Sequence, residues 1–135
     1  MDFDGTVVEN NNYPRLGKEL PGAIDTLLRV QELGGRFYLW TCRGGQELED
    51  AQKFLLSRGI ALHAPYYLEG GAKPLADLYI DDRGLGAPLT PRGLDWAAIA
   101  PRLIEAMEST SRAETGCASS QEIDSPRSRQ GDGEQ

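Results

Sequence analysis

The chain has 135 residues, enough for one domain, and its 39% hydrophobic and 26% charged residues are normal for a soluble globular protein. The net charge of −7 and the lack of a basic patch disfavour a nucleic-acid partner. No apolar run is long enough to cross a bilayer and the acidic first residues are unlike a signal peptide, so we expect no membrane association and a cytoplasmic location. The single histidine, His63, argues against a Ser-His-Asp triad, so any chemistry must rest mainly on carboxylates.

The first segment, DFDGT at residues 2–6, carries two carboxylates two positions apart. On a strand, Asp2 and Asp4 point to the same face. At a strand end one of them can act as a nucleophile while the other handles protons. An acidic turn at a frayed terminus is the alternative for the DxD pattern alone. The complete DFDGT string favours a functional pair.

Two helices are predicted in the first half of the chain. Residues 21–33 begin with a proline, which suits a first helical turn, and two glycines follow them. Residues 47–58 carry an apolar stripe and end before Gly59. The stripe consists of Leu48, Ala51, Leu55 and Leu56.

Three short apolar runs are predicted to be strands, at residues 37–40, 60–62 and 78–80. The first, FYLW, is continuous, as expected for a strand that is buried on both faces. A last helix is expected from Trp96 to about Glu108, with Asp95 as its N-cap. This alternation of strands and helices predicts a Rossmann-like α/β domain, with a parallel sheet covered by helices on both faces.

The domain is expected to span residues 1–108, followed by a polar tail at residues 109–135. The tail has one large aliphatic residue, Ile123, and no aromatic residue. It cannot bury enough apolar surface to offset the entropy lost on ordering, so we expect it to be disordered.

Polar side chains follow the predicted strands. Thr41 ends the FYLW run, at the sheet edge where open α/β folds bind ligands, and could donate a hydrogen bond to a phosphate oxygen. Arg43 could reach the same anion, although a solvated arginine is the alternative. Lys73, in a loop, could neutralise a phosphoryl group and a nearby carboxylate, although loop lysines usually lie only at the surface.

Two adjacent carboxylates, Asp81 and Asp82, directly follow the run at residues 78–80. Neighbouring negative charges repel each other unless a cation joins them. A hard cation with oxygen ligands would explain the pair. Pairing of Asp82 with Arg83 is the alternative.

Taken in order, these strings resemble the four motifs of the haloacid dehalogenase superfamily of phosphohydrolases. The matching residues are DFDGT at 2–6, LWTCR at 39–43, Lys73, and ADLYIDDR at 76–83. The similarity covers about residues 1–108 and is greatest to the small capless members. It implies the Rossmann-like fold and a Mg²⁺-dependent phosphomonoester hydrolase that acts on a phosphorylated substrate of unknown identity.

The resemblance also implies a role for each residue. Asp2 would attack phosphorus to form an aspartyl-phosphate, and Asp4 would protonate the leaving group and then activate water. Thr41 and Lys73 would hold the phosphoryl group. Asp81, aided by Asp82, would bind Mg²⁺ together with Asp2 and the backbone carbonyl of Asp4.

The spacing between the motifs leaves no room for a cap domain, so we expect an open site unless a second subunit covers it in a homo-oligomer. Members of the superfamily carry several apolar residues ahead of the first aspartate. Here only Met1 precedes it, so we expect the first strand to be largely missing. A non-catalytic phosphate- or metal-binding module of the same fold is therefore the alternative. A receiver domain is disfavoured because its carboxylate pair comes early in the chain.

Overall fold

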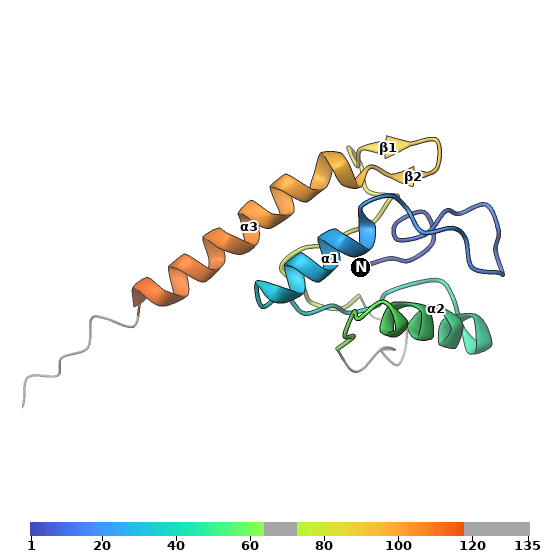
Figure 1. Cartoon of the computed structure of the whole chain (residues 1–135), viewed down its shortest axis with the longest axis horizontal. Coiled ribbons are helices and arrows are strands. Elements are labelled where there is room, and N and C mark those ends of the chain that lie inside the picture. Colours follow the sequence, from blue (N-terminus) through green and yellow to red (C-terminus); the bar gives the residue numbers. More distant parts are fainter. Residues whose placement is uncertain (64–72, 118–135) are drawn as a thin grey trace, which may run out of the picture.

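The computed structural model describes residues 1–63 and 73–117. Three helices account for most of the regular structure (Figure 1): α1, Ala23–Glu32; α2, Gly45–Ser57; and α3, Trp96–Cys117. Two short antiparallel strands, β1 (Leu89–Thr90) and β2 (Gly93–Leu94), form a hairpin immediately before α3. Within these residues no helix is long and apolar enough to cross a membrane.

Helices α1 and α2 form where their apolar stripes predict them. The buried side chains of α1 include Ile24, Leu27 and Val30, which recur at helical spacing. In α2 the buried residues are Ala51 and Leu55. Leu56, expected on the same stripe, is instead 54% exposed. It lies one position, and so about 100° of rotation, beyond Leu55, which carries it off the buried face.

Helix α3 begins as predicted and extends further than predicted. The Ala98 N–H donates to Oδ1 of Asp95 at 3.3 Å, which confirms Asp95 as the N-cap. The helix then continues past the expected end near Glu108 to Cys117. No proline interrupts residues 109–117, and their only glycine is the penultimate residue of the helix. The first part of the predicted tail is therefore helical, whereas residues 118–135 lie outside the described residues.

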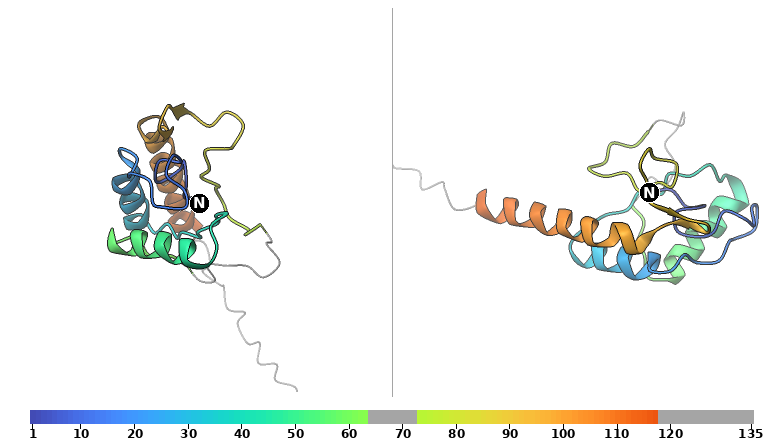
Figure 2. Two further views of the ribbon diagram at one scale, coloured as in Figure 1. Left: turned by 90° about the vertical axis from the view of Figure 1, so that its right-hand side faces the viewer. Right: turned by 90° about the horizontal axis from the view of Figure 1, so that it is seen from above.

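Helix α1 packs against the first part of α3, whose C-terminal half projects beyond the rest of the described chain (Figures 1 and 2). The core lies beneath these helices and α2. Among its fully buried side chains are one large aromatic from the first segment and one from the start of α3. The largest fully buried side chains are those of Phe3, Thr6, Val7, Val8, Leu20, Leu27, Leu55, Ile60 and Trp96.

The three runs predicted to be strands are joined by isolated backbone bonds, while the only strands assigned in the described residues are β1 and β2. Phe37 and Leu62 form a parallel bridge. Residues 37–40 also bond to Met1, which donates to the Tyr38 carbonyl at 2.8 Å and accepts from the Trp40 N–H at 2.9 Å. On its other side the first segment bonds to the third run, because the Asp2 N–H donates to the Ile80 carbonyl at 2.9 Å.

Residues 37–40 are not buried on both faces as predicted. Phe37 and Leu39 are buried, whereas Trp40 is 38% exposed and lies edge-on to Tyr79. The side chains alternate between the core and the surface, as they do along a backbone segment with only one face against the core.

Candidate functional site

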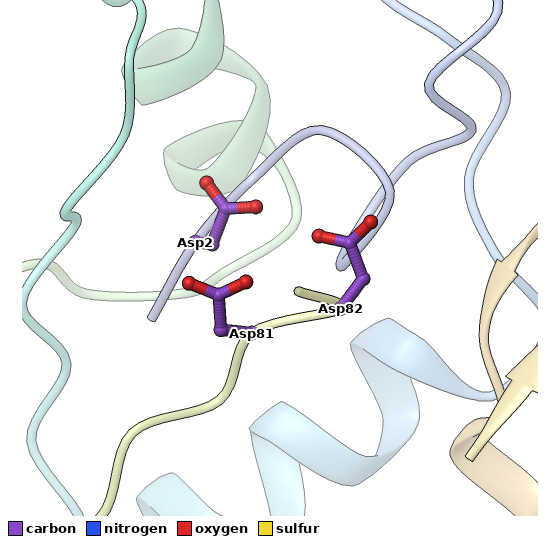
Figure 3. Close-up of side chains that lie close together, drawn as sticks. All are labelled: Asp2, Asp81 and Asp82. Atoms are coloured by element: carbon purple, nitrogen blue, oxygen red, sulfur yellow. The ribbon is translucent and has the colours of Figure 1, made fainter. Parts of the chain in front are cut away.

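Three carboxylates from two distant parts of the chain meet in the structure (Figure 3). Asp2, Asp81 and Asp82 each offer an oxygen atom, and these atoms all lie within 4.8 Å of one another. The bond from the Asp2 N–H to the Ile80 carbonyl brings the two segments together. All three residues are half-buried. A group of carboxylate oxygens suits a hard divalent cation such as Mg²⁺, so this cluster fits the predicted metal.

The hydroxyl of Thr6 links the two parts of the carboxylate cluster. Its Oγ1 lies 3.2 Å from Oδ2 of Asp2 and 3.4 Å from Oδ1 of Asp82. It also accepts a hydrogen bond from the Asp82 N–H at 3.1 Å. Thr6 is fully buried. Thr6 belongs to the DFDGT string but was not among the predicted site residues, and its hydroxyl in that string was the signal that could have identified it.

Gly5 allows Asp82 to approach the first segment. Its φ is +80°, and a Cβ at this position would lie 2.8 Å from Cγ of Asp82 and closer still to Oδ2. Any other side chain would therefore combine an unfavourable backbone conformation with a steric clash. The glycine of DFDGT is needed for this contact between segments, as well as for the turn.

Negative charge accumulates at the cluster. Burial, followed by the charges of Asp81 and Asp82, raises the pKa of Asp2 from 3.8 to about 6. Arg83 pairs with the cluster through its Nε, which lies 3.5 Å from Oδ2 of Asp82, so the predicted alternative pair does form. The Arg83 side chain is largely exposed, and a pair of this kind offsets little charge.

Asp4 lies outside this cluster and is paired with Arg43. The guanidinium donates from Nε to Oδ2 and from Nη2 to Oδ1, both at 2.6 Å. It also donates to the carbonyls of Pro14 and Arg15 at 2.9 and 3.0 Å. The Asp4 carboxylate holds the pKa of Arg43 above its ordinary value.

The structure therefore differs from the expected role of Arg43 as an anion-binding residue. Its side chain is 0% exposed and lies against the rings of Phe3 and Tyr13. Four acceptors, two from Asp4 and two from the backbone, draw the guanidinium into the interior. A buried guanidinium needs such partners, because an unpaired buried charge is costly.

Thr41 and Lys73 are not placed on the cluster by any hydrogen bond or ion pair in the part of the chain that the structure describes. The Thr41 Oγ1 accepts a hydrogen bond from the Arg43 N–H at 3.2 Å. The Lys73 ammonium lies 4.1 Å from the ring centre of Tyr79 and 5.7 Å from that of Trp40. A lysine over two aromatic faces is in a cation–π contact, which here competes with the predicted phosphate-binding position.

A cleft of about 290 Å³ borders the cluster through Gly5 and Asp82. Its other walls are residues 9–11 and 89–93, the second of which form the β1–β2 hairpin. Arg92 donates to Glu9 across this cleft and lowers the pKa of that carboxyl. Its walls carry both polar and apolar groups, and it gives a small molecule room beside Asp82.

The same architecture occurs in a solved structure of a conserved protein coded by a locus of Bacteroides thetaiotaomicron. The two chains are 38% identical and superpose with a TM-score of 0.63, over 78% of this chain and 87% of the other. The chain belongs to the family of this conserved protein. A scan against protein-family models and a search of curated proteins gave no match.

Proposed function

We propose that the chain is a Mg²⁺-dependent phosphomonoester hydrolase of the haloacid dehalogenase type, with Asp2 as the nucleophile. The observation that carries this proposal is the meeting of Asp2 with Asp81 and Asp82 within 4.8 Å. A nucleophilic carboxylate beside a pair of metal-ligating carboxylates is the arrangement that attack on a phosphoryl group requires, because the cation offsets the negative charge of both reactants.

The backbone bonds support a Rossmann-like arrangement for this site. They connect the segments in the order Leu62, residues 37–40, residues 1–2, Ile80. Met1 donates to the residue before Leu39 and accepts from the residue after it, which is the pattern of a parallel pair. In this order Asp2 lies at the end of a central segment, and Asp81 and Asp82 lie at the end of the neighbouring segment that contains Ile80. Ligands of open α/β sheets bind at such an edge.

The residues of this chain would divide the chemistry as follows. Asp2 would attack phosphorus, with Thr6 fixing the orientation of its carboxylate. Asp81 and Asp82 would hold Mg²⁺ together with Asp2, and the ion would supply charge neutralisation at the phosphoryl oxygens. Lys73 would join them by leaving the rings of Tyr79 and Trp40, a movement open to an exposed side chain.

Hydrolysis of an aryl phosphate with Mg²⁺, and with a chelator in its place, tests the proposal. Asp2→Asn removes the nucleophile and should lower kcat by about 10³-fold or more, as loss of a covalent nucleophile does in other hydrolases. Asp77→Asn is the matched control, because Asp77 is an exposed aspartate of the neighbouring segment outside the cluster. It should retain activity within about twofold. Metal-independent turnover, or full activity in Asp2→Asn, would contradict the proposal.

A non-catalytic metal-binding module is a second candidate, favoured by two observations. The acid/base candidate Asp4 is engaged by Arg43, and Lys73 lies on aromatic rings. Calorimetry distinguishes the two functions. Mg²⁺ binding that Asp81→Asn abolishes, in a protein that turns over no phosphate ester, would support the binding module.

A further inference from the structure

The cleft beside the carboxylate cluster lies between two segments that are fixed by backbone contacts. On one wall, the Glu9 N–H donates to the Lys18 carbonyl at 2.8 Å. On the other wall, the β1–β2 hairpin lies so close to the first segment that a Cβ at Gly93 would be 2.6 Å from the Gly5 carbonyl oxygen. The space between them, about 290 Å³, is near the lower end of the range for small-molecule sites.

This cleft adjoins the proposed reaction centre. Gly5 and Asp82 line it, and the same two residues form the contact between the segments of the carboxylate cluster. A phosphoryl group held at the cluster would therefore place the rest of its ester beside the cleft. The residues of the cleft are thus in position to distinguish one leaving group from another.

The polar side chains of the cleft offer both donors and acceptors of hydrogen bonds. Arg92 donates through Nε to Glu9, and Asn11 donates through Nδ2 to the second oxygen of Glu9 at 3.1 Å. In the part of the chain that the structure describes, the two Nη groups of Arg92 and the Asn11 side-chain carbonyl have no hydrogen-bond partner. The exposed amide of Asn10 adds a further donor and acceptor. Hydroxyl groups match this mixture, because each hydroxyl can donate and accept.

The charges that line the cleft disfavour a second anionic group on the ligand. Glu9 and Asp82 bring two carboxylates, whereas Arg92 brings one positive charge, which Glu9 already engages. A carboxylate or phosphate in the cleft would therefore lie near negative charge that is not balanced there. Leu89 and Pro91 add apolar surface, which suits the carbon skeleton of a ligand.

Resting on the proposed function, we infer that the cleft binds an uncharged leaving group that carries several hydroxyls. The site then prefers phosphate esters of polyols and sugars over esters of simple alcohols or of hydroxy acids. The Nη groups of Arg92 can donate to two neighbouring hydroxyl oxygens, while the Asn11 carbonyl accepts from a hydroxyl and the Asn10 amide binds another. These residues determine specificity, and the chemical step is the hydrolysis already proposed.

Three phosphate monoesters with linear six-carbon chains test this preference: sorbitol 6-phosphate, hexyl phosphate and 6-phosphogluconate. All are primary alkyl esters. Hexyl phosphate lacks the hydroxyls, and 6-phosphogluconate ends in a carboxylate. The kcat/KM of the full chain is measured by phosphate release in Mg²⁺, with p-nitrophenyl phosphate as a general substrate. One net hydrogen bond is worth roughly 2- to 10-fold, so several bonds should favour sorbitol 6-phosphate by at least about 10-fold over each of the other two.

Two variants separate recognition by the cleft from the intrinsic reactivity of the esters. Arg92→Lys keeps a positive charge beside Glu9 but loses the fork of two Nη groups. Asn10→Ala removes an exposed amide of the cleft. Each variant should reduce the ratio of kcat/KM for sorbitol 6-phosphate to that for hexyl phosphate by roughly 2- to 10-fold. A variant that only loosened the fold would lower both values together.

Each variant has a matched control outside the cleft. Asn12→Ala removes another exposed asparagine of the same loop, which does not line the cleft. Arg58→Lys changes another arginine that pairs with a carboxylate, Glu19, at the end of α2. Both controls should keep the wild-type ratio.

Each outcome decides the inference. A preference for sorbitol 6-phosphate that falls in the cleft variants but not in the controls supports it. Equal kcat/KM for sorbitol 6-phosphate and either of the other esters, or a preference that the cleft variants leave unchanged, would overturn the inference. Turnover of p-nitrophenyl phosphate in the same protein would then leave the proposed hydrolase intact. Failure to turn over all four esters in Mg²⁺ would overturn the proposed function and the inference with it.

Discussion

At the scale of single residues, the first segment is shaped by the approach of Asp82 to Gly5 and Thr6. Gly5 provides the space, and Thr6 provides a hydroxyl within 3.2 to 3.4 Å of two carboxylates. Both belong to the DFDGT string, in which only the two aspartates were predicted to be site residues. The glycine and the threonine therefore serve the cluster as much as the acids do.

Gly5→Ala should disrupt the cluster because its new methyl group would clash with the Asp82 carboxylate. Gly34→Ala is the matched control: its φ is +89°, but nothing lies within 4 Å of its missing Cβ. We expect the control to lose only the backbone term of about 1 kcal/mol in the free energy of unfolding. Gly5→Ala should lose more, and its Mg²⁺ affinity should fall, measured by denaturant unfolding and calorimetry. Equal losses in the two variants would contradict the steric argument.

The raised pKa of Asp2 predicts a pH dependence for the metal-free chain. Burial raises this pKa to about 6 in the folded state, from 3.8 in a free carboxyl. The folded chain therefore holds a proton in this range that the unfolded chain has lost. The contribution of the protonated Asp2 carboxyl to the free energy of unfolding is therefore fully present below pH 3.8 and is lost as the pH rises through about 6.

Urea unfolding in the presence of a chelator, across that pH range, measures this effect. Asp2→Asn has no titrating carboxyl at this position, so its free energy of unfolding should vary less with pH than that of the wild-type chain. Mg²⁺ should bind more weakly below pH 6, since it must then displace the proton from Asp2. A pH-independent affinity would contradict the shift.

At the scale of elements, the start of α3 is tied to the site loop. Trp96 is buried, and its Nε1–H donates to the Thr6 carbonyl at 2.7 Å. The β1–β2 hairpin adds a second tie, because the Leu94 N–H donates to the Gly5 carbonyl at 2.8 Å. The hairpin and α3, which follow the aspartate pair in the sequence, therefore support the backbone of Gly5 and Thr6 in the first segment.

Trp96→Phe should therefore weaken the fold. It leaves the buried Thr6 carbonyl without its donor and removes part of a core side chain. We expect a loss of about 1–3 kcal/mol in the free energy of unfolding, measured by denaturant titration. Trp40→Phe, at an exposed tryptophan, should change it by less than about 0.5 kcal/mol. A similar cost at both sites would argue against the Thr6 hydrogen bond.

At the scale of the whole molecule, the carboxylate cluster joins the first segment of the chain to the segment that ends at Asp82, far away in the sequence. Thr6 and Asp82 are 76 positions apart in the sequence, yet they share a hydrogen bond. A cation bound between Asp2 and the aspartate pair would link these segments in the folded state only. Metal binding and folding should therefore be coupled.

Mg²⁺ should accordingly stabilise the whole chain. At a concentration of about 100 times Kd, the free energy of unfolding should rise by roughly 2.7 kcal/mol, and the thermal midpoint should rise with it. Asp81→Asn should abolish most of this increase, while Asp77→Asn should keep it, because only Asp81 belongs to the cluster. An equal Mg²⁺ effect in both variants would mean that the ion binds elsewhere.

The sequence by itself determined the three helices, the N-cap of α3 and the residues of the carboxylate cluster. These follow from local signals: apolar periodicity, a capping residue, and acids placed directly after apolar runs. The burial of residues 37–40 and the end of α3 were predicted less well. The first depends on which face meets the core. The second depends on how far a helix continues once its packed first half has formed.

Only the tertiary structure decided which charged groups became partners. Asp4 and Arg43 are 39 positions apart, and both could equally have faced solvent or a phosphate. The carbonyls of Pro14 and Arg15 complete an interior site that makes the ion pair the better arrangement for the guanidinium. Lys73 likewise met two aromatic rings that no local pattern connects to it. Local sequence fixes what each side chain can do, whereas the distances between remote segments decide which of those interactions form.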